Sequence, residues 1–191
     1  MKTCEPIFQD WLLEVKKDIK RKGSFWHPTL VSGEQNARTV ILRSVEFIKK
    51  GAISKPRFIV HTDTRSHKWQ ELKNNTKATL HFYCPKRRWQ MRVQVSAELS
   101  LLDTDATIEW KRLSKNSQRI YSLKNSPGTI IQDPKAAYTF PEEIDGFDNF
   151  GVLNLIPIHM ESLQLERVNG PSFHQRALWD LNTHTFQYLA P

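Results

Sequence analysis

The clearest pattern of hydrophobic and polar positions lies in the middle of the chain, between residues 91 and 101. Apolar side chains occupy every second position there, and polar ones stand between them: Met91, Val93, Val95, Ala97, Leu99 and Leu101 alternate with Arg92, Gln94, Ser96, Glu98 and Ser100. A period of two places all the apolar side chains on one face of an extended chain. The pattern therefore predicts a long, half-buried β-strand.

Shorter runs rich in β-branched and aromatic residues predict further strands, separated by turn residues such as glycine, proline and asparagine. The expected strands cover residues 38–48, 57–62, 77–84, 149–168, 174–181 and 184–191, with turns at 51–56, at Pro85, at 169–171 and at Asn182. The stretch before residue 38, which contains Pro28 and Gly33, is expected to be a loop.

Helical spacing is found in fewer places. Apolar residues recur three or four positions apart between Pro6 and Gly23, which predicts an amphipathic N-terminal helix. Shorter helices are expected after Ser66 as N-cap, from 103 to 113 and from 117 to 123. Many antiparallel strands with few helices predict a mainly β (α+β) fold, a closed or partly open barrel, formed as a single domain over residues 1–191.

Composition narrows the class of protein. A hydrophobic content of 39% is enough for a folded core, and the N-terminus has no long apolar run, so we expect a cytoplasmic protein without a signal peptide or membrane span. Cys4 and Cys84 stand alone, which argues against disulfides and cysteine zinc sites. The net charge of +8 is spread along the chain among acidic residues, which favours a small phosphorylated ligand over a nucleic-acid surface.

Donor-rich chemistry gathers where one predicted strand passes into a helix, in the stretch "HTDTRSHK" from residue 61 to residue 68. Free backbone N–H groups, hydroxyls and basic side chains at a helix N-terminus can bind a phosphate. The alternative is that Ser66 caps the helix while the basic side chains are solvated. Arg38 and Arg43 at the ends of "RTVILR", and Gln90 before the long strand, add cations and an amide that favour an anionic ligand with a heterocyclic ring.

These motifs, with "WQMRV" from residue 89 and "HQRALW" and "YLAP" near the C-terminus, resemble the pyridoxamine 5'-phosphate oxidase-like flavoproteins, which have the FMN-binding split β-barrel fold. The resemblance runs in the family's order along nearly the whole chain. It implies FMN as cofactor, no metal, an oxidoreductase acting on a small molecule, and a homodimer with its cofactor sites at the interface. The implied FMN contacts are Arg38, Thr39, Val40, Ile41, Arg43, His61, Thr62, Ser66, His67, Lys68 and Gln90, with Asn125, Ser126 and Arg176 from the partner chain.

Departures from the family pattern concern the substrate. Glu109 and Leu113 stand where the oxidase has a tyrosine and an arginine for the substrate's phosphate, Ser172 replaces a further arginine, and Leu165 replaces a tryptophan beside the flavin. We therefore expect a retained cofactor site and an altered substrate site, with His174 as candidate acid or base. Two alternatives stay open: a flavin- or haem-binding split barrel without oxidase activity, and a nucleic-acid-binding barrel that stacks bases on Trp69, Trp89 and Trp110.

Overall fold

The structure, a computed structural model, describes residues 6–50, 53–141, 145–165 and 174–191. The helices are α1 (Pro6–Arg21), η1 (Ser24–Trp26), α2 (His67–Asn74), α3 (Thr104–Arg112), α4 (Lys115–Arg119), η2 (Ile120–Ser122), η3 (Pro134–Tyr138) and η4 (Gly146–Asn149). The strands are β1 (Thr29–Ser32), β2 (Asn36–Thr39), β3 (Leu42–Lys50), β4 (Ile53–Asp63), β5 (Lys77–Cys84), β6 (Trp89–Leu101), β7 (Phe150–Leu165), β8 (His174–Asp180) and β9 (Thr185–Leu189).

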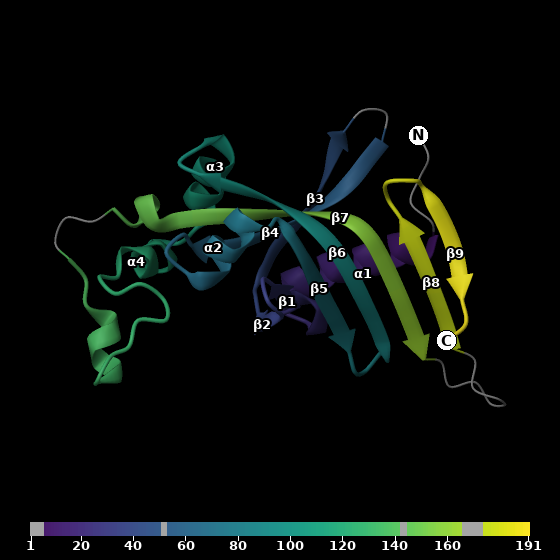
Figure 1. Cartoon of the computed structure of the whole chain (residues 1–191), viewed down its shortest axis with the longest axis horizontal. Helices are drawn as coiled ribbons and strands as arrows, with labels where there is room; N and C mark the ends of the chain where they lie inside the picture. Colours follow the sequence, from purple (N-terminus) through teal and green to yellow (C-terminus); the bar gives the residue numbers. More distant parts are fainter. Residues whose placement is uncertain (1–5, 51–52, 142–144, 166–173) are drawn as a thin grey trace.

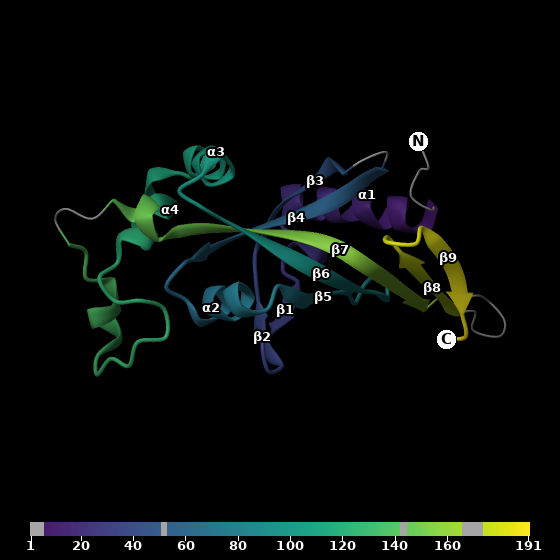
Figure 2. The ribbon, with the colours of Figure 1, turned by 45° about the horizontal axis from the view of Figure 1, so that its top comes forward.

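The strands form one strongly curved antiparallel sheet in the order β2-β1-β5-β6-β7-β4-β3, with β8 and β9 added along β7 (Figures 1 and 2). Strand β7 joins the two parts of the sheet. Its first half, Phe150–Leu155, pairs with β4, and its second half, His159–Leu165, pairs with β8, while β6 follows it along nearly its whole length. The predicted mainly β fold with short helices is confirmed.

The main core lies between α1 and the concave side of the sheet. The alternation predicted for β6 is present from Met91 to Ala97, with Met91, Val93 and Val95 buried on this side. It is wrong at the end of the strand, where Ser100 is buried and Leu101 is exposed. The Trp11 ring of α1 makes edge contacts with three phenylalanines from different elements, at centroid distances of 4.9 to 6.2 Å: Phe25, Phe58 and Phe82. The apolar face of α1 thus fills the side of the barrel that the strands leave open.

A second, smaller core covers the opposite face of the sheet beneath α3. Ile59 from β4 and Phe150 from β7 are buried there, and Trp110 from α3 packs against Phe150. Successive residues of β4 therefore contact different cores, since Phe58 and Val60 belong to the main one. Both faces of β4 are covered where the strand reaches its C-terminal end.

The predicted strand over residues 38–48 is wrong in one respect, because the chain breaks it at Val40 and Ile41 into β2 and β3. The Val40 N–H donates to the Pro28 carbonyl, 2.9 Å away, while β2 pairs with β1 and β3 pairs with β4. Strand β1 itself lies in the stretch predicted as a loop. An apolar run shows that residues are buried but not that they change pairing partner midway.

Other predicted boundaries shift in the same way. Residues 53–56, expected in a turn, belong to β4, with Pro56 opposite Phe47.

The predicted turn at 169–171, together with Ser172 and Cys4, lies outside the described residues. None of the helices within the described ranges is long and apolar enough to span a membrane.

Candidate functional site

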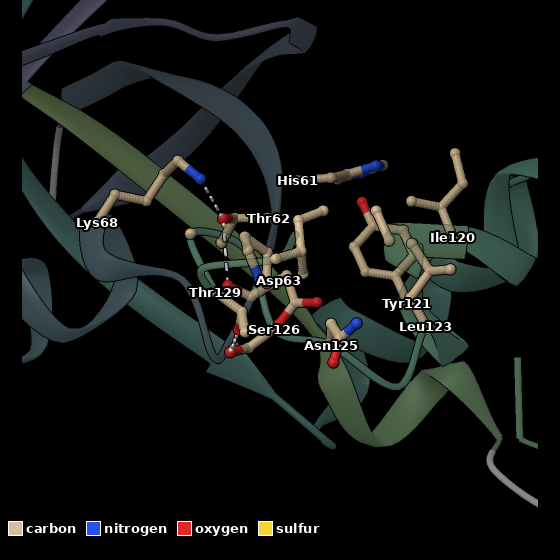
Figure 3. Close-up of a pocket in the computed structure, with 14 residues that line it drawn as sticks. His61, Thr62, Asp63, Lys68, Ile120, Tyr121, Leu123, Asn125, Ser126 and Thr129 are labelled. Atoms are coloured by element: carbon tan, nitrogen blue, oxygen red, sulfur yellow. Dashed lines mark hydrogen bonds between the residues drawn. The ribbon is translucent and has the colours of Figure 1, made fainter. Parts of the chain in front are cut away.

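A cleft of about 500 Å³ opens at the C-terminal end of β4, where the chain turns into α2 (Figure 3). One wall is formed by the end of β4 and the start of α2, and the other by the segment from Ile120 to Ala137. The side chains labelled in Figure 3 that line it are His61, Thr62, Asp63, Lys68, Ile120, Tyr121, Leu123, Asn125, Ser126 and Thr129.

Thr62 and Lys68 of the first wall form a compact polar group with the buried Ser66 behind them. The Thr62 hydroxyl lies 3.1 Å from the Ser66 hydroxyl and accepts a hydrogen bond of 3.1 Å from the Lys68 ammonium. Ser66 stands at the N-cap position of α2, as predicted, but its hydroxyl does not cap the helix, because it is turned to Thr62. The Ser66 hydroxyl, which could have capped α2, therefore belongs to the polar group that could bind an anion.

Lys68 carries the positive charge of this group. Burial lowers the pKa of its ammonium, and the nearby Arg38 guanidinium lowers it further, which outweighs the raising effect of the Asp63 and Glu71 carboxylates. Within the described part of the chain, Lys68 makes no ion pair. A half-buried cation without a direct ion pair leaves a place for an anionic ligand group, which would replace the water that burial removes.

The Glu71 carboxylate of α2 contacts both Arg38 and His67. Arg38 pairs with it at 3.1 Å and also donates to the Ser32 hydroxyl, while the exposed ring of His67 pairs with it at 2.9 Å. His67 keeps 79% of its side chain exposed and does not line the cleft. Of Arg38, His67 and Lys68, only Lys68 is therefore left without a carboxylate in direct contact among the described residues.

The segment from residue 39 to residue 43 lies beside the cleft rather than in its wall. Thr39 is exposed, Val40 is buried, and Ile41 lies in the link between β2 and β3. The Arg43 guanidinium lies close enough to lower the pKa values of both His61 and Tyr121. Its Nε is buried without a hydrogen-bond partner among the described residues. Burial outweighs Arg43 at Tyr121 and raises the pKa of this phenol to about 12, so it stays protonated at neutral pH.

Asn125 and Ser126 line the second wall of the cleft and belong to the same chain as Lys68. The expectation that they reach the site from the partner chain stays a prediction. Arg65 ties the two walls together: its guanidinium pairs with Asp63 at 2.7 Å and donates to the Leu123 carbonyl at 2.9 Å. The role of Arg65 was missed from the sequence, where it reads as one more solvated cation.

His61 faces away from Thr62, because neighbouring residues of a strand point to opposite sides. Its Nε2 lies 2.8 Å from Oε2 of Glu109, and only 2% and 7% of the two side chains are exposed. The other oxygen of Glu109 accepts from Arg112. Burial lowers the pKa of His61, so the ring is neutral at pH 7. The sequence offered no sign of this pair, whose members are 48 residues apart.

The remaining predicted residues lie at the other end of the sheet. Gln90, Leu163 and Arg176 stand opposite one another on β6, β7 and β8, and Arg176 pairs with Glu161 at 2.7 Å. On β7, this row is twelve residues from Gly151, the partner of Thr62. At the usual rise this is about 40 Å along the strand, and Figure 1 shows β8 and α4 at opposite ends of the molecule.

His174 belongs to this distant group as well. It stands opposite Leu165 on β7 and lines a shallow pocket with Arg176 and Tyr188. Its Nδ1 is buried and has no hydrogen-bond partner among the residues described. The predicted site residues thus form two groups in one chain, one around Lys68 and one around Arg176.

The three tryptophans considered for base stacking are used in the cores. Trp69 and Trp89 are buried, and the Trp89 indole donates to the Ser162 hydroxyl at 2.7 Å. Trp110 packs against Phe150 with ring centroids 5.2 Å apart. These rings hold the fold together and do not form a stacking surface.

Comparison with known proteins points to one family. Residues 9–100 match the family model described as "Pyridoxamine 5'-phosphate oxidase, FMN-binding domain". No match was found among curated protein sequences.

Two solved structures share the fold over nearly the whole chain. A pyridoxamine 5'-phosphate oxidase-related, FMN-binding protein from Nostoc punctiforme superposes with a TM-score of 0.73 at 19% identity, covering 99% of each chain. PhzG from Burkholderia lata, solved with tetrahydrophenazine-1-carboxylic acid, gives 0.70 at 17% identity, covering 100% of this chain and 94% of that one.

Proposed function

We propose that the chain is a divergent relative of the pyridoxamine 5'-phosphate oxidase-like FMN-binding proteins, that it binds FMN in the cleft beside Lys68, and that it acts as an FMN-dependent oxidoreductase on a small molecule. The observation that carries the proposal is the half-buried Lys68 ammonium, which donates a hydrogen bond to Thr62 and makes no direct ion pair among the described residues. A phosphate monoester would supply the missing charge and accept hydrogen bonds from Lys68, Thr62 and Ser66.

The protein's part in this function is binding and orientation. FMN, when bound, supplies the two-electron redox chemistry. Lys68, Thr62 and Ser66 hold the phosphate end, and Arg65 keeps the wall with Asn125 and Ser126 against it.

A homodimer completes the proposal. Gln90 and Arg176 lie too far from Lys68 to contact the same small ligand within one chain. A symmetric pairing that places the β8 end of one copy against the cleft of the other would bring both groups to each of two equivalent sites. The exposed Tyr188 and Leu101 offer apolar surface for such a contact.

Titration with FMN and with riboflavin, which lacks the phosphate, tests the proposal directly. We expect FMN to bind with a flavin absorption spectrum perturbed by the protein, and riboflavin to bind about ten- to hundredfold more weakly, because a charge-assisted contact contributes about 1.5 to 3 kcal/mol. A calorimetric titration without FMN binding, or equal affinities for the two flavins, would contradict the proposal.

We further propose that pyridoxamine 5'-phosphate is not the substrate. The resemblance aligns Glu109 and Leu113 with the tyrosine and the arginine that hold the substrate's phosphate in the oxidase. Glu109 contacts His61 and Arg112, and it would offer this dianion a carboxylate instead of a hydrogen-bond donor. Losing the two phosphate contacts that the tyrosine and the arginine make in the oxidase would cost about 3 to 6 kcal/mol of binding free energy, which is a hundredfold to ten-thousandfold in affinity. Steady-state kinetics of the FMN-loaded protein with pyridoxamine 5'-phosphate and oxygen decide it, since a kcat/KM above about 10⁴ M⁻¹s⁻¹ would refute the claim.

A further inference from the structure

The end of α1 and the turn between β5 and β6 are both strongly basic. Their sequences are "KKDIKRK" from residue 16 to residue 22 and "KRR" from residue 86 to residue 88. Arg87 of the turn joins them, because its guanidinium lies 2.8 Å from the Glu14 carboxylate and 3.2 Å from the Asp18 carboxylate of α1. The same guanidinium lies over the Phe25 ring, 5.1 Å from its centroid. The fold thus brings two basic runs, far apart in the sequence, onto one surface.

The two carboxylates in contact with this surface do not neutralise it. Glu14 and Asp18 together pair with three of its cations: Lys17, Arg21 and Arg87. Four more cations of the two runs make no ion pair with any described residue: Lys20, Lys22, Lys86 and Arg88. The three lysines among them are exposed. Their charges are therefore available to an anion in the solvent.

Two aromatic rings lie beside these cations. The Lys22 ammonium lies over the Trp26 ring, 5.6 Å from its centroid, and the ring centroids of Trp26 and His27 are 4.1 Å apart. Trp26 is half-buried and His27 is exposed. Flat rings next to fixed cations allow bases to stack on the rings while neighbouring phosphates contact the lysines.

We propose that the basic surface formed by residues 16–22, 26–27 and 86–88 binds single-stranded nucleic acid. A phosphodiester backbone carries one negative charge per nucleotide, so a strand presents a row of anions to this group of cations. A single small anion would contact only one or two of the side chains. The bases of a single strand can reach Trp26 and His27, whereas the bases of a duplex are stacked inside it. This binding is a further function, independent of the FMN cleft.

An acidic membrane fits the basic surface less well. Basic helices bind membranes by inserting an apolar face into the lipid. The apolar face of α1 is already buried in the main core, with Phe8, Trp11 and Val15 fully covered. Leu13 is exposed, but it lies about two turns before Lys20. The end of α1 therefore offers cations without the apolar side chains that insertion into lipid needs.

The basic surface and the residues of the proposed dimer contact lie on opposite faces of the sheet. Helix α1 covers the face of β6 that carries Met91. The neighbouring Gln90 points to the other face, on which Arg92 and Arg176 contact Glu161. A homodimer formed through that other face leaves the outer side of α1 exposed, so FMN and a nucleic acid strand can be bound at the same time.

Neutralising three exposed lysines of the basic surface tests the proposal. The test variant carries Lys20→Gln, Lys22→Gln and Lys86→Gln. The matched control carries Lys73→Gln, Lys77→Gln and Lys111→Gln, which are exposed lysines on other elements, so both triple variants have the same net charge. None of the six lysines lines the FMN cleft or makes an ion pair with a described residue. Both variants are therefore expected to fold, and to bind FMN, like the wild type.

The measurement is fluorescence anisotropy of a labelled single strand of about 20 nucleotides, as DNA and as RNA of the same sequence, titrated with the full chain at several salt concentrations. Binding of either strand by the wild type and by the control supports the inference. The test variant should bind at least about tenfold more weakly at about 0.1 M salt, and its slope of log K against log salt should be shallower by about 2, because three phosphate contacts are lost. A duplex of the same sequence should bind more weakly than the strand.

Four results would overturn the inference: no binding of either strand by the wild type, equal losses in the test variant and the control, binding of the duplex as tight as that of the strand or tighter, or binding of phosphatidylglycerol vesicles in preference to the strand. FMN titration of the same proteins is a separate readout, so a failure of FMN binding would count against the proposed function alone.

Discussion

Lys68 is a charged residue whose partly buried position is explained by a bound anion. Its ammonium is half-buried, its pKa is lowered first by burial and then by Arg38, and one hydroxyl, that of Thr62, accepts from it. Such an arrangement is unfavourable for the empty protein and becomes favourable once an anion binds. The free-energy cost of burying the Lys68 ammonium therefore supports an anionic ligand in the cleft.

At this scale we predict that Lys68→Ala weakens FMN binding about ten- to hundredfold, because a charge-assisted contact to the phosphate is lost. Lys73→Ala is the control, since it removes the same charge from the exposed last turn of the same helix. Calorimetry or fluorescence quenching gives both Kd values. Equal losses in the two variants would show that Lys68 acts only through the overall charge.

Among the elements, the contact between α1 and the turn after β5 depends on one buried carboxylate. Asp18 of α1 accepts from the Phe25 N–H at 3.0 Å and from two nitrogens of Arg87 at 3.2 Å, and it pairs with Arg21 at 2.8 Å. Burial by itself raises the pKa of Asp18, but the hydrogen bonds from Arg87, Phe25 and Arg21 outweigh it. The net pKa lies below that of an ordinary aspartate.

We predict that this network stabilises the fold at neutral pH and fails in acid. Since the folded-state pKa is depressed, the stabilisation is complete above the unfolded pKa of about 3.9 and is lost as the pH falls through the lower folded value. Asp18→Asn should cost about 1 to 3 kcal/mol at pH 7 and much less at the acid end. Urea unfolding across this pH range measures it, and a constant difference between variant and wild type would refute the assignment.

On the scale of the whole molecule, the long β7 strand decides how the site can be assembled. It carries Gly151 beside the cleft at one end and Leu163 beside Arg176 at the other. Each chain thus has a cleft half and an arginine half, held apart by the sheet between them (Figure 1). In a homodimer each cofactor site would combine Lys68 of one copy with Arg176 of the other.

This arrangement predicts complementation between two defective variants. Lys68→Ala and Arg176→Ala should each bind FMN poorly in all of their sites. In a mixed dimer, one site would carry both substitutions and the other none, so unfolding and refolding the two variants together should restore tight binding in about one quarter of all sites if the copies pair at random.

Light scattering and FMN titration of the mixture test this prediction. The control is each variant refolded alone, which should not recover. A monomeric mass with FMN fully bound, or a mixture no better than its components, would contradict an interface that is shared in this way.

The local pattern of the sequence determined much of the fold. Alternation identified β6, helical spacing identified α1, and the hydroxyl and lysine chemistry after β4 identified the group around Thr62. These features depend on residues a few positions apart, or on a fixed period of apolar positions. They can therefore be predicted without knowing which distant segment packs against them.

Tertiary structure decided the rest, because it depends on pairing between distant segments. The division of residues 38–48 between β2 and β3 follows from which strand each half meets, and neither partner is visible in the run itself. Arg65 holds the Leu123 carbonyl beside the end of β4, and Glu109 contacts His61, which is 48 residues away in the sequence. The separation of Arg176 from Lys68 follows from the length of β7, which no local pattern of hydrophobic and polar residues contains.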